Sequence, residues 1–195
     1  MTISDTCFWV LDEAGMQREH AFDQKIFDNI LRLFRVEYKN KPRIIDLGCG
    51  RCDYTNRLLD LGHDVIGVDG NPATKQYCRN PDKIFVHDLT QPLELNPFDV
   101  VICLEVGEHI PVQYERNLID NINRLLKPGG HLILSWSIDF GDSGYGHVNC
   151  RPNLYIRDLF GSLGYTSLPR YDRRFRSHVE KWWFKHTVMI FKKGL

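Results

Sequence analysis

The feature that most constrains this sequence is a short apolar run that ends in an acid and two glycines, Arg43-Ile-Ile-Asp-Leu-Gly-Cys-Gly50. The pattern predicts a buried strand that opens into a tight turn, where bare backbone can approach a ligand. A second apolar run, Asp64-Val-Ile-Gly-Val-Asp69, also ends in an acid. Together the two runs indicate a nucleoside-cofactor site at the carboxyl ends of parallel strands.

Length and composition favour one globular domain without a charge bias. The chain has 195 residues, of which 43% are apolar, and its 25 basic and 25 acidic residues balance. No global field therefore attracts it to nucleic acid or to a membrane. No apolar run approaches the roughly 20 residues that span a bilayer, and no secretory signal is visible. We expect a cytoplasmic protein without a membrane partner and with reduced cysteines, while its oligomeric state stays open.

Strands and helices alternate along most of the chain. The spacing of apolar residues predicts a first helix over Arg18–Glu37. Strands are predicted at 43–46, 64–68, 83–86, 99–104, 131–136, 165–168 and 182–191, and helices at 53–61, after Pro72, at 111–126 and at 152–161. This alternation predicts an α/β fold with a doubly wound, mostly parallel seven-stranded sheet and helices on both faces. The last two strands lack a clear helix of normal length between them, which predicts an antiparallel hairpin at the C-terminal edge.

Two kinds of nucleoside cofactor compete for the glycine turn. A dinucleotide-binding turn has the spacing G-x-G-x-x-G, whereas Gly48-Cys-Gly-Arg-Cys-Asp53 has an acid in the third position. A pyrophosphate at the start of the following helix would meet this carboxylate, but a cofactor with an amino acid and a sulfonium would not be repelled. Cys49 and Cys52 also form a CxxC pair, for which small residues lining a turn are a simpler interpretation than a metal or redox site.

Further signals lie at the ends of the predicted strands. The segments that carry them are Asp46-Leu-Gly-Cys-Gly50, Asp69-Gly-Asn71, Asp88-Leu89, Phe98-Asp-Val-Val-Ile-Cys-Leu-Glu105 and Leu126-Lys-Pro-Gly-Gly-His-Leu-Ile-Leu134. In order and spacing they resemble the class I S-adenosylmethionine-dependent methyltransferases, which have a Rossmann-like fold. The resemblance implies that the glycine turn contacts the methionine part, that Asp69 binds the ribose hydroxyls and that Asp88 binds the adenine amino group. The cofactor-binding residues that it implies are Asp46, Gly48, Cys49, Gly50, Asp69, Gly70, Asn71, Asp88, Leu89, Leu104 and Glu105.

The implied reaction is an SN2 methyl transfer, for which the protein aligns a nucleophile and removes its proton. The acceptor site would follow the fourth predicted strand and include His147, which lies in the loop after the fifth. If residues 105–109 form a helical turn, Glu105, Glu108 and His109 face one way. The predicted catalytic residues are Glu108, His109 and His147.

Two interpretations of these side chains stay open. In the first, Glu105, Glu108, His109 and His147 bind a divalent metal (Mn, Fe, Co, Ni, Zn or Mg) that lowers the pKa of an acceptor hydroxyl. The pattern resembles the metal site of the small-RNA 3′-terminal 2′-O-methyltransferases and the matching segment of ubiquinone-pathway O-methyltransferases, although His147 lies in a different local context. In the second, no metal binds, a glutamate caps the next helix, and His109 or His147 is a lone general base.

The whole chain, 1–195, is predicted to be one methyltransferase domain in three parts. Residues 41–137 form the cofactor-binding core, 1–40 an N-terminal lid or helical extension, and 138–195 an acceptor-side loop and the C-terminal hairpin. Within the first part, Phe8, Trp9 and Glu13 are candidates for a lid over the acceptor. The basic and aromatic segment Arg170–His186 is interpreted as an amphipathic connection into the last strand rather than as a clamp for an anionic acceptor.

The predicted function is methyl transfer to an oxygen or nitrogen of a small-molecule acceptor. RNA methylation of the 2′-O type is an alternative, because the segment 170–186 is basic. A non-catalytic sensor or partner protein that binds S-adenosylmethionine is a second alternative, from a different class.

Overall fold

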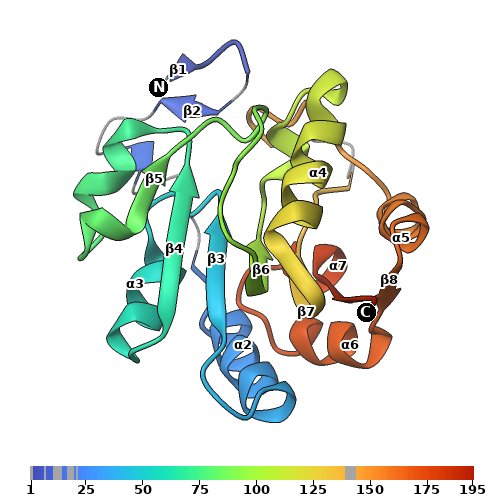
Figure 1. Cartoon of the computed structure of the whole chain (residues 1–195). Helices are drawn as coiled ribbons and strands as arrows, with labels where there is room; N and C mark the ends of the chain where they lie inside the picture. Colours follow the sequence, from blue (N-terminus) through green and yellow to red (C-terminus); the bar gives the residue numbers. More distant parts are fainter. Residues whose placement is uncertain (1, 7, 11–14, 17–19, 21, 139–143) are drawn as a thin grey trace.

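The structure, a computed structural model, describes residues 2–6, 8–10, 15–16, 20, 22–138 and 144–195. Within these residues seven strands form one sheet in the order β5-β4-β3-β6-β7-β9-β8 (Figure 1). The strands are β3 (Arg43–Leu47), β4 (Asp64–Asp69), β5 (Ile84–Val86), β6 (Phe98–Cys103), β7 (Leu126–Leu134), β8 (Tyr165–Ser167) and β9 (Met189–Lys193). The first five run parallel, and β9 is antiparallel to both β7 and β8. The predicted sheet with its antiparallel C-terminal pair is confirmed.

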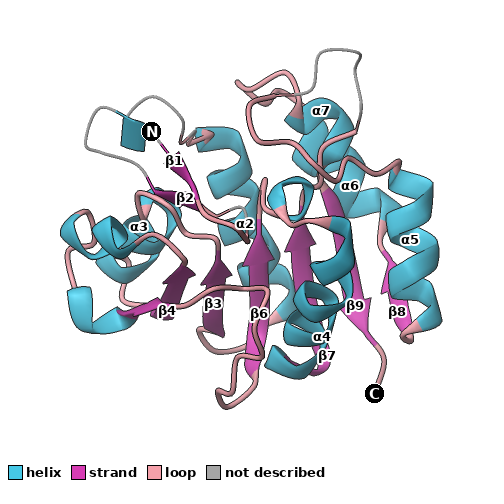
Figure 2. Cartoon of the chain, turned by 90° about the horizontal axis from the view of Figure 1, so that it is seen from above, coloured by secondary structure: helices cyan, strands magenta, loops and turns pink. Residues whose placement is uncertain are grey.

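The strand order reverses next to β3. The chain lays down β3, β4 and β5 towards one edge and then returns to place β6 on the other side of β3. Such a reversal opens a crevice at the carboxyl ends of the two central strands, where open α/β sheets bind ligands. A short hairpin of β1 (Thr2–Ile3) and β2 (Trp9–Val10) lies over this end of the sheet (Figures 1 and 2). The fold therefore places the N-terminal segment beside the predicted cofactor site.

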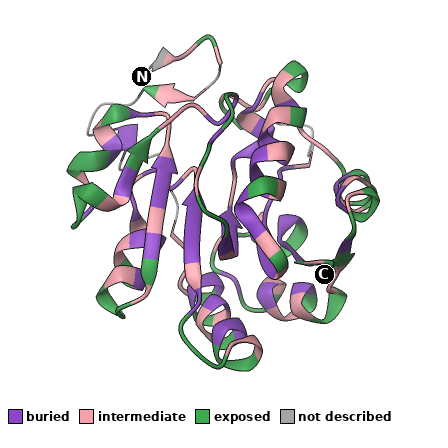
Figure 3. Ribbon diagram, viewed as in Figure 1, coloured by how far each residue is buried: buried purple, intermediate pink, exposed green. Residues whose placement is uncertain are grey.

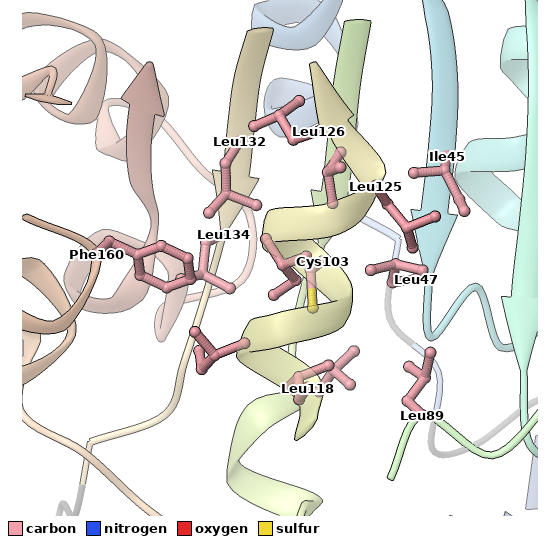
Figure 4. Packing of buried hydrophobic residues seen from close by; sticks show 14 of the residues in the cluster. Ile45, Leu47, Leu89, Cys103, Leu118, Leu125, Leu126, Leu132, Leu134 and Phe160 are labelled. Atoms are coloured by element: carbon pink, nitrogen blue, oxygen red, sulfur yellow. The ribbon is translucent and has the colours of Figure 1, made fainter. Parts of the chain in front are cut away.

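The central strands are buried on both faces, which explains their continuous apolar runs. The longer helices of the described residues are α2 (Gln24–Glu37), α3 (Asp53–Asp60), α4 (Glu115–Leu125), α5 (Asn153–Ser162) and α6 (Pro169–Arg176). Ile45 packs in a cluster with α4 and α5, as Figure 4 shows, whereas Ile44 packs in a second cluster with α2, α3 and α6. Neighbouring residues of a strand point to opposite faces, so each supports a different core. In Figure 3 the central strands are mostly buried, and the helices around them are exposed in part.

Helix α2 begins at Asp23, whose carboxylate connects two distant parts of the chain. One oxygen accepts the backbone N–H groups of Lys25 (2.9 Å) and Ile26 (3.1 Å) and caps the helix. The other accepts the backbone N–H groups of Glu180 (2.7 Å) and Lys181 (2.8 Å). Because Asp23 is fully buried, this one side chain fixes the start of α2 against the segment before α7 (Phe184–Thr187). The helix predicted over 18–37 is too long at its N-terminal end: residue 18 lies outside the described residues, but residues 20, 22 and 23 are not helical.

The prediction that the last strand begins at Trp182 is wrong. Strand β9 starts at Met189, and α7 precedes it. Residues 184–187 are helical because the N–H of Thr187 donates to the carbonyl of Trp183 (3.1 Å). The side chain of Phe184 is also buried, in the cluster that contains residues of α2. Helix α6 also forms between β8 and β9, so these strands pair across a longer connection than a hairpin turn. None of the helices in the described part of the chain is both long and apolar enough to cross a membrane.

Candidate active site

A cavity of about 420 Å³ opens at the carboxyl ends of the central strands. Its described walls come from the N-terminal segment, from the turn after β3, from the loops after β4, β5, β6 and β7, and from the segment before α7. The predicted site residues that line it are Asp46, Gly48, Cys49, Asp69, Gly70, Asn71, Asp88, Leu89, Leu104, Glu105, His109 and His147. Gly50 and Glu108 do not line it and lie behind its wall. The fold thus brings the predicted cofactor and acceptor residues to one cavity.

The turn after β3 needs both of its glycines. The backbone N–H of Gly48 donates to the carbonyl of Val68 (2.8 Å), which holds the turn against β4. The φ angles of Gly48 and Gly50 are 73° and 50°. A Cβ on Gly48 would lie 2.3 Å from Cγ2 of Val106, and one on Gly50 would lie 1.9 Å from Cδ2 of His20. Left-handed backbone and close neighbours on two sides therefore explain the spacing read from the sequence.

Asp69 ends β4 with its carboxylate fixed by the backbone. The N–H of Gly50 donates to Oδ2 and the N–H of Asn71 to Oδ1, both at 2.8 Å. Burial raises the pKa of Asp69, and these two hydrogen bonds oppose the rise. The side-chain oxygen of Asn71 accepts the N–H of Ala73 (3.0 Å) and caps the short helix η1 (Pro72–Gln76). Each carboxylate oxygen of Asp69 keeps a lone pair for a hydroxyl donor in the cavity.

Asp46 lies beneath the turn and is almost completely buried. Its Oδ2 accepts the hydroxyl of Thr55 at 2.7 Å. Burial raises the pKa of Asp46 to about 6; the bond from Thr55 opposes this rise, and the nearby carboxylates of Asp69 and Asp53 add to it. Asp46 therefore joins the end of β3 to α3 and also reaches the cavity wall.

The Asp46→Asn variant is expected to lose part of the pH dependence of stability. Because the folded-state pKa of about 6 lies above the ordinary value of 3.8, the stabilising contribution of Asp46 is complete below pH 3.8 and is lost as the pH rises through 6. The shift corresponds to about 3 kcal/mol. Urea unfolding of the cofactor-free wild type and variant at pH 4 and pH 7 measures it. The stability difference between the two proteins should change between these pH values; an unchanged difference would contradict the burial of this acid.

The N-terminal segment meets the predicted adenine end of the cavity, a contact that the sequence did not indicate. The hydroxyl of Thr6 donates to Oδ2 of Asp88 (2.5 Å), while Oδ1 accepts the N–H of Thr90 (2.9 Å). Phe8 packs so closely on Gly70 that a Cβ there would lie 2.4 Å from the ring. Asp88 is therefore held in place by both a local and a distant donor.

Glu105 does not share a helical turn with Glu108 and His109. Its backbone is left-handed, with φ 56°, and the turn η3 (Gly107–His109) begins only two residues later. The N–H of Glu105 donates to Oγ of Ser135 (2.7 Å). Burial raises the pKa of the Glu105 carboxyl to about 7, and hydrogen bonds from neighbouring side chains, Ser135 first, oppose the rise. Of the four predicted metal ligands, Glu105 is the one that stands apart.

Glu108, His109 and His147 come together: one ligand atom from each lies within 4.8 Å of the others. Because a carbonyl oxygen only accepts, the 3.0 Å contact between Nδ1 of His109 and the carbonyl of Gly146 makes Nδ1 the donor and leaves Nε2 free. Burial lowers the pKa of His109 to about 4, with a smaller effect from His147, and burial also lowers the pKa of His147. Both imidazoles are therefore neutral at pH 7 and keep a lone pair.

The chemistry of this group fits a divalent transition metal. One carboxylate and two neutral imidazoles suit Mn, Fe, Co, Ni or Zn better than Ca. Glu108 is 0% exposed, and within the described residues neither of its carboxylate oxygens has a hydrogen-bond partner. Such oxygens need a cation or a proton. Burial, and then the neighbouring Glu105, raise the pKa of Glu108.

Among the described residues, the acceptor end of the cavity is aromatic and has no free lysine or arginine. Its aromatic walls are Trp9, Tyr145, Trp182, Trp183 and Phe184. The indole of Trp9 packs edge-on against His109, with ring centroids 4.7 Å apart. Arg51 is the only lysine or arginine among the described residues that line the cavity, and its guanidinium donates to Asp53 (2.8 Å). On the part of the wall that the structure describes, an anionic acceptor would find no unpaired lysine or arginine.

The basic and aromatic segment 170–186 packs as an amphipathic connection. Phe175 is buried in the core, and the carboxylate of Asp172 accepts from Arg157 (2.6 Å) and from the N–H of Ile190 (2.7 Å). The indoles of Trp182 and Trp183 in this segment reach the cavity wall, while most of the segment's basic side chains are exposed or half-buried. Glu13, a candidate lid residue, lies outside the described residues, as do residues 139–143 of the acceptor-side loop.

The cysteines of the turn fill the space beneath it. The Sγ atoms of Cys49 and Cys52 lie 3.9 Å apart in a buried cluster that also contains Cys78. Burial raises the pKa of the Cys49 thiol well above its usual range, which makes it a poor nucleophile and metal ligand. These contacts support the interpretation as small residues that line the turn.

Comparison with known proteins points to one family. The family model of a methyltransferase domain matches residues 45–134. The chain is 27% identical over 135 residues to the mitochondrial ubiquinone biosynthesis O-methyltransferase of Schizosaccharomyces pombe, covering 63% of this chain and 48% of that protein. It is 34% identical to the ubiquinone biosynthesis O-methyltransferase of Alkalilimnicola ehrlichii, covering 62% and 47%. The chain therefore spans about half the length of these relatives.

The fold matches solved structures over most of the chain. The magnesium protoporphyrin IX methyltransferase of Synechocystis, solved with bound S-adenosylmethionine, superposes with a TM-score of 0.66 at 19% identity. The match covers 88% of this chain and 79% of that one. At this identity the likeness concerns the fold alone.

Proposed function

We propose that this chain, which belongs to the class I S-adenosylmethionine-dependent methyltransferases, transfers the methyl group of that cofactor to a small-molecule acceptor. The observation that carries the proposal is the arrangement of the glycine turn, Asp69 and Asp88 around one cavity at the reversal of strand order. Three separate strand ends supply these groups, which is how this fold holds a nucleoside.

The cofactor residues follow from where each strand ends. Gly48 and Cys49 would face the methionine part beside Asp46, and Gly50, which does not line the cavity, would act through the hydrogen bond of its N–H to Asp69. Asp69 would accept both ribose hydroxyls, because its carboxylate is already oriented by two backbone N–H groups. The adenine and the sulfonium would be bordered by Gly70, Asn71, Asp88, Leu89, Leu104 and Glu105. In this assignment residues 41–137 form the cofactor-binding core, and 1–40 an N-terminal lid and helical extension. Phe8 and Trp9 of the lid line the cavity, and Thr6 bonds Asp88.

The acceptor is proposed to be a small molecule that offers a hydroxyl oxygen or a nitrogen. The aromatic walls supply flat apolar surface for such a molecule. An RNA acceptor is disfavoured, because the described lining residues offer no free lysine or arginine to pair with its phosphates. The names of the relatives, which are O-methyltransferases, favour oxygen. Residues 138–195 would form the acceptor side.

During the transfer, the acceptor atom forms a bond to the methyl carbon while the carbon–sulfur bond breaks. The acceptor's proton must leave, and the neutral imidazoles of His109 and His147 are available to take it. Where a divalent cation is present, Glu108, His109 and His147 would hold it, and the cation would lower the pKa of an acceptor hydroxyl. The ligand set proposed here contains three of the four residues predicted from the sequence.

Titration with Mn²⁺ or Co²⁺ tests the metal-assisted version. We expect one ion to bind per wild-type chain and to bind at least about tenfold more weakly in Glu108→Gln, which keeps the size of the side chain but not its charge. The control is the variant His87→Ala. This residue lies on the loop after β5 and outside the ligand group, so the variant should bind the ion as tightly as wild type does.

Chelation tests the same version through activity. Methyl transfer should fall when a chelator removes the ion and recover when the ion is added back. Turnover that chelation leaves undiminished would contradict the metal and leave the imidazoles as general bases.

A further inference from the structure

The loop that carries His147 returns to the fold through Asn149, which is held on three sides. Its N–H donates to the carbonyl of Glu108 (2.9 Å), and its own carbonyl accepts the indole N–H of Trp136 (2.7 Å). Its side-chain amide donates to Oε2 of Glu115 (2.9 Å). Asn149 is 4% exposed, so each of these bonds is made away from bulk water.

Glu115, the first residue of α4, gathers donors from this return segment. Besides Asn149, it accepts Nε of Arg151 (2.9 Å) and the hydroxyl of Tyr155 (2.5 Å). Burial opposes ionisation of Glu115, but the hydrogen bonds from Tyr155, Asn149 and Arg151 outweigh it and lower the pKa of the carboxyl. A charged, buried acceptor with three donors is a rigid anchor.

The anchored segment encloses His147 between two attachments to the same short turn. On one side, the carbonyl of Gly146 accepts Nδ1 of His109 (3.0 Å). On the other, the N–H groups of Val148 (2.8 Å) and Asn149 (2.9 Å) donate to the carbonyl of Glu108. The imidazoles of His109 and His147 consequently meet edge-on, with ring centroids 4.8 Å apart.

We infer that Asn149 and Glu115 are positioning residues, a side-chain clamp that sets His147 against Glu108 and His109. The inference rests on the proposed function, since it assigns the clamp to the acceptor end of that site. Neither residue lines the cavity, so each would act through His147 rather than on the acceptor itself.

The test exchanges donor and acceptor within the clamp. Asn149→Asp puts a second carboxylate against Glu115, which breaks the amide bond and adds like-charge repulsion. We expect kcat for methyl transfer to fall at least about tenfold while the Kd for S-adenosylhomocysteine stays within about twofold, because the cofactor residues are untouched. Adding Glu115→Gln makes the helix residue the donor and the loop residue the acceptor. The new amide donor also meets Arg151, which shares Oε2 of Glu115 with Asn149, so this double variant should recover at least about threefold of the lost kcat rather than all of it.

The matched control is Tyr155→Phe, which removes a different partner of Glu115 and leaves Asn149 and Arg151 bonded. Its kcat should stay within about twofold of wild type. The inference is overturned if Asn149→Asp keeps its kcat, or if it loses kcat and the double variant does not recover it. A loss of cofactor affinity equal to the loss of kcat would also overturn it, because that indicates general damage to the fold.

Hydrogen exchange separates this inference from the proposed function. The amide protons of Val148 and residue 149 should exchange at least about tenfold faster in Asn149→Asp and return towards wild type in the double variant, while those of β6 stay protected. If wild type methylates no acceptor but this exchange pattern is found, the clamp stands and the proposed function fails. If wild type is active and the exchange of these amides is unchanged, the clamp fails alone.

Discussion

Replacing Asp69 with alanine is expected to weaken binding of S-adenosylmethionine and S-adenosylhomocysteine by at least about a hundredfold, or about 2.7 kcal/mol. The side chain is the proposed acceptor for both ribose hydroxyls, and each hydrogen bond to a charged group contributes about 1.5–3 kcal/mol. The substitution also frees the N–H groups of Gly50 and Asn71, which orient the turn through the same carboxylate. Isothermal titration calorimetry of the folded variant measures the loss.

Asp64→Ala is the matched control, because it removes an acid from the opposite end of the same strand. The side chain of Asp64 is 53% exposed and pairs with Lys83 (3.0 Å) and Arg43 (3.2 Å), far from the cavity wall. Its cofactor affinity should stay within about twofold of wild type. Equal losses in the two variants would mean that the acid at the carboxyl end of β4 has no special role, and would contradict the proposed ribose contact.

Replacing Asp23 with alanine is expected to reduce the free energy of unfolding by about 3–5 kcal/mol. The change leaves four backbone N–H groups without their acceptor, in a place where the wild-type side chain is fully buried. Loss of the helix cap alone costs about 1 kcal/mol, and the rest is expected from the broken link between α2 and residues 180–181. Urea unfolding followed by circular dichroism provides the measurement.

A second aspartate in the same helix gives the control. Asp28 is exposed; it accepts a solvent-exposed hydrogen bond from Gln24 (2.8 Å) and lies 3.9 Å from Lys25, so Asp28→Ala should change stability by less than about 0.5 kcal/mol. If Asp23→Ala were no more destabilising than Asp28→Ala, the carboxylate would not be the link that the hydrogen bonds describe.

The cofactor half of the molecule could be predicted because its signals are local. Apolar runs buried on both faces gave β3, β4 and β6, and a glycine turn with acids at neighbouring strand ends gave the site. Each signal depends on residues close in the sequence, and the parallel topology brings them together without further information. The two glycines illustrate this, since their positive φ angles are a property of the turn itself.

The structure of the acceptor half could not be predicted in the same way, because it depends on contacts that no local sequence pattern reveals. The helix at Phe184 replaced a predicted strand because burial of that side chain against α2, not local propensity, decided its conformation. The left-handed backbone at Glu105 separated it from Glu108, although the spacing suggested one helical face. The bonds of Thr6 to Asp88 and of Asp23 to residues 180–181 join segments far apart in the chain, so they become visible only in the folded structure.

Calorimetric titration of the wild-type chain with S-adenosylhomocysteine tests the central claim most directly. The geometry of the glycine turn, Asp69 and Asp88 predicts saturable binding of one molecule per chain, with a Kd on the order of micromolar. Folded protein that gives no binding heat and no thermal stabilisation at about 1 mM ligand would contradict the assignment of this cavity to the cofactor.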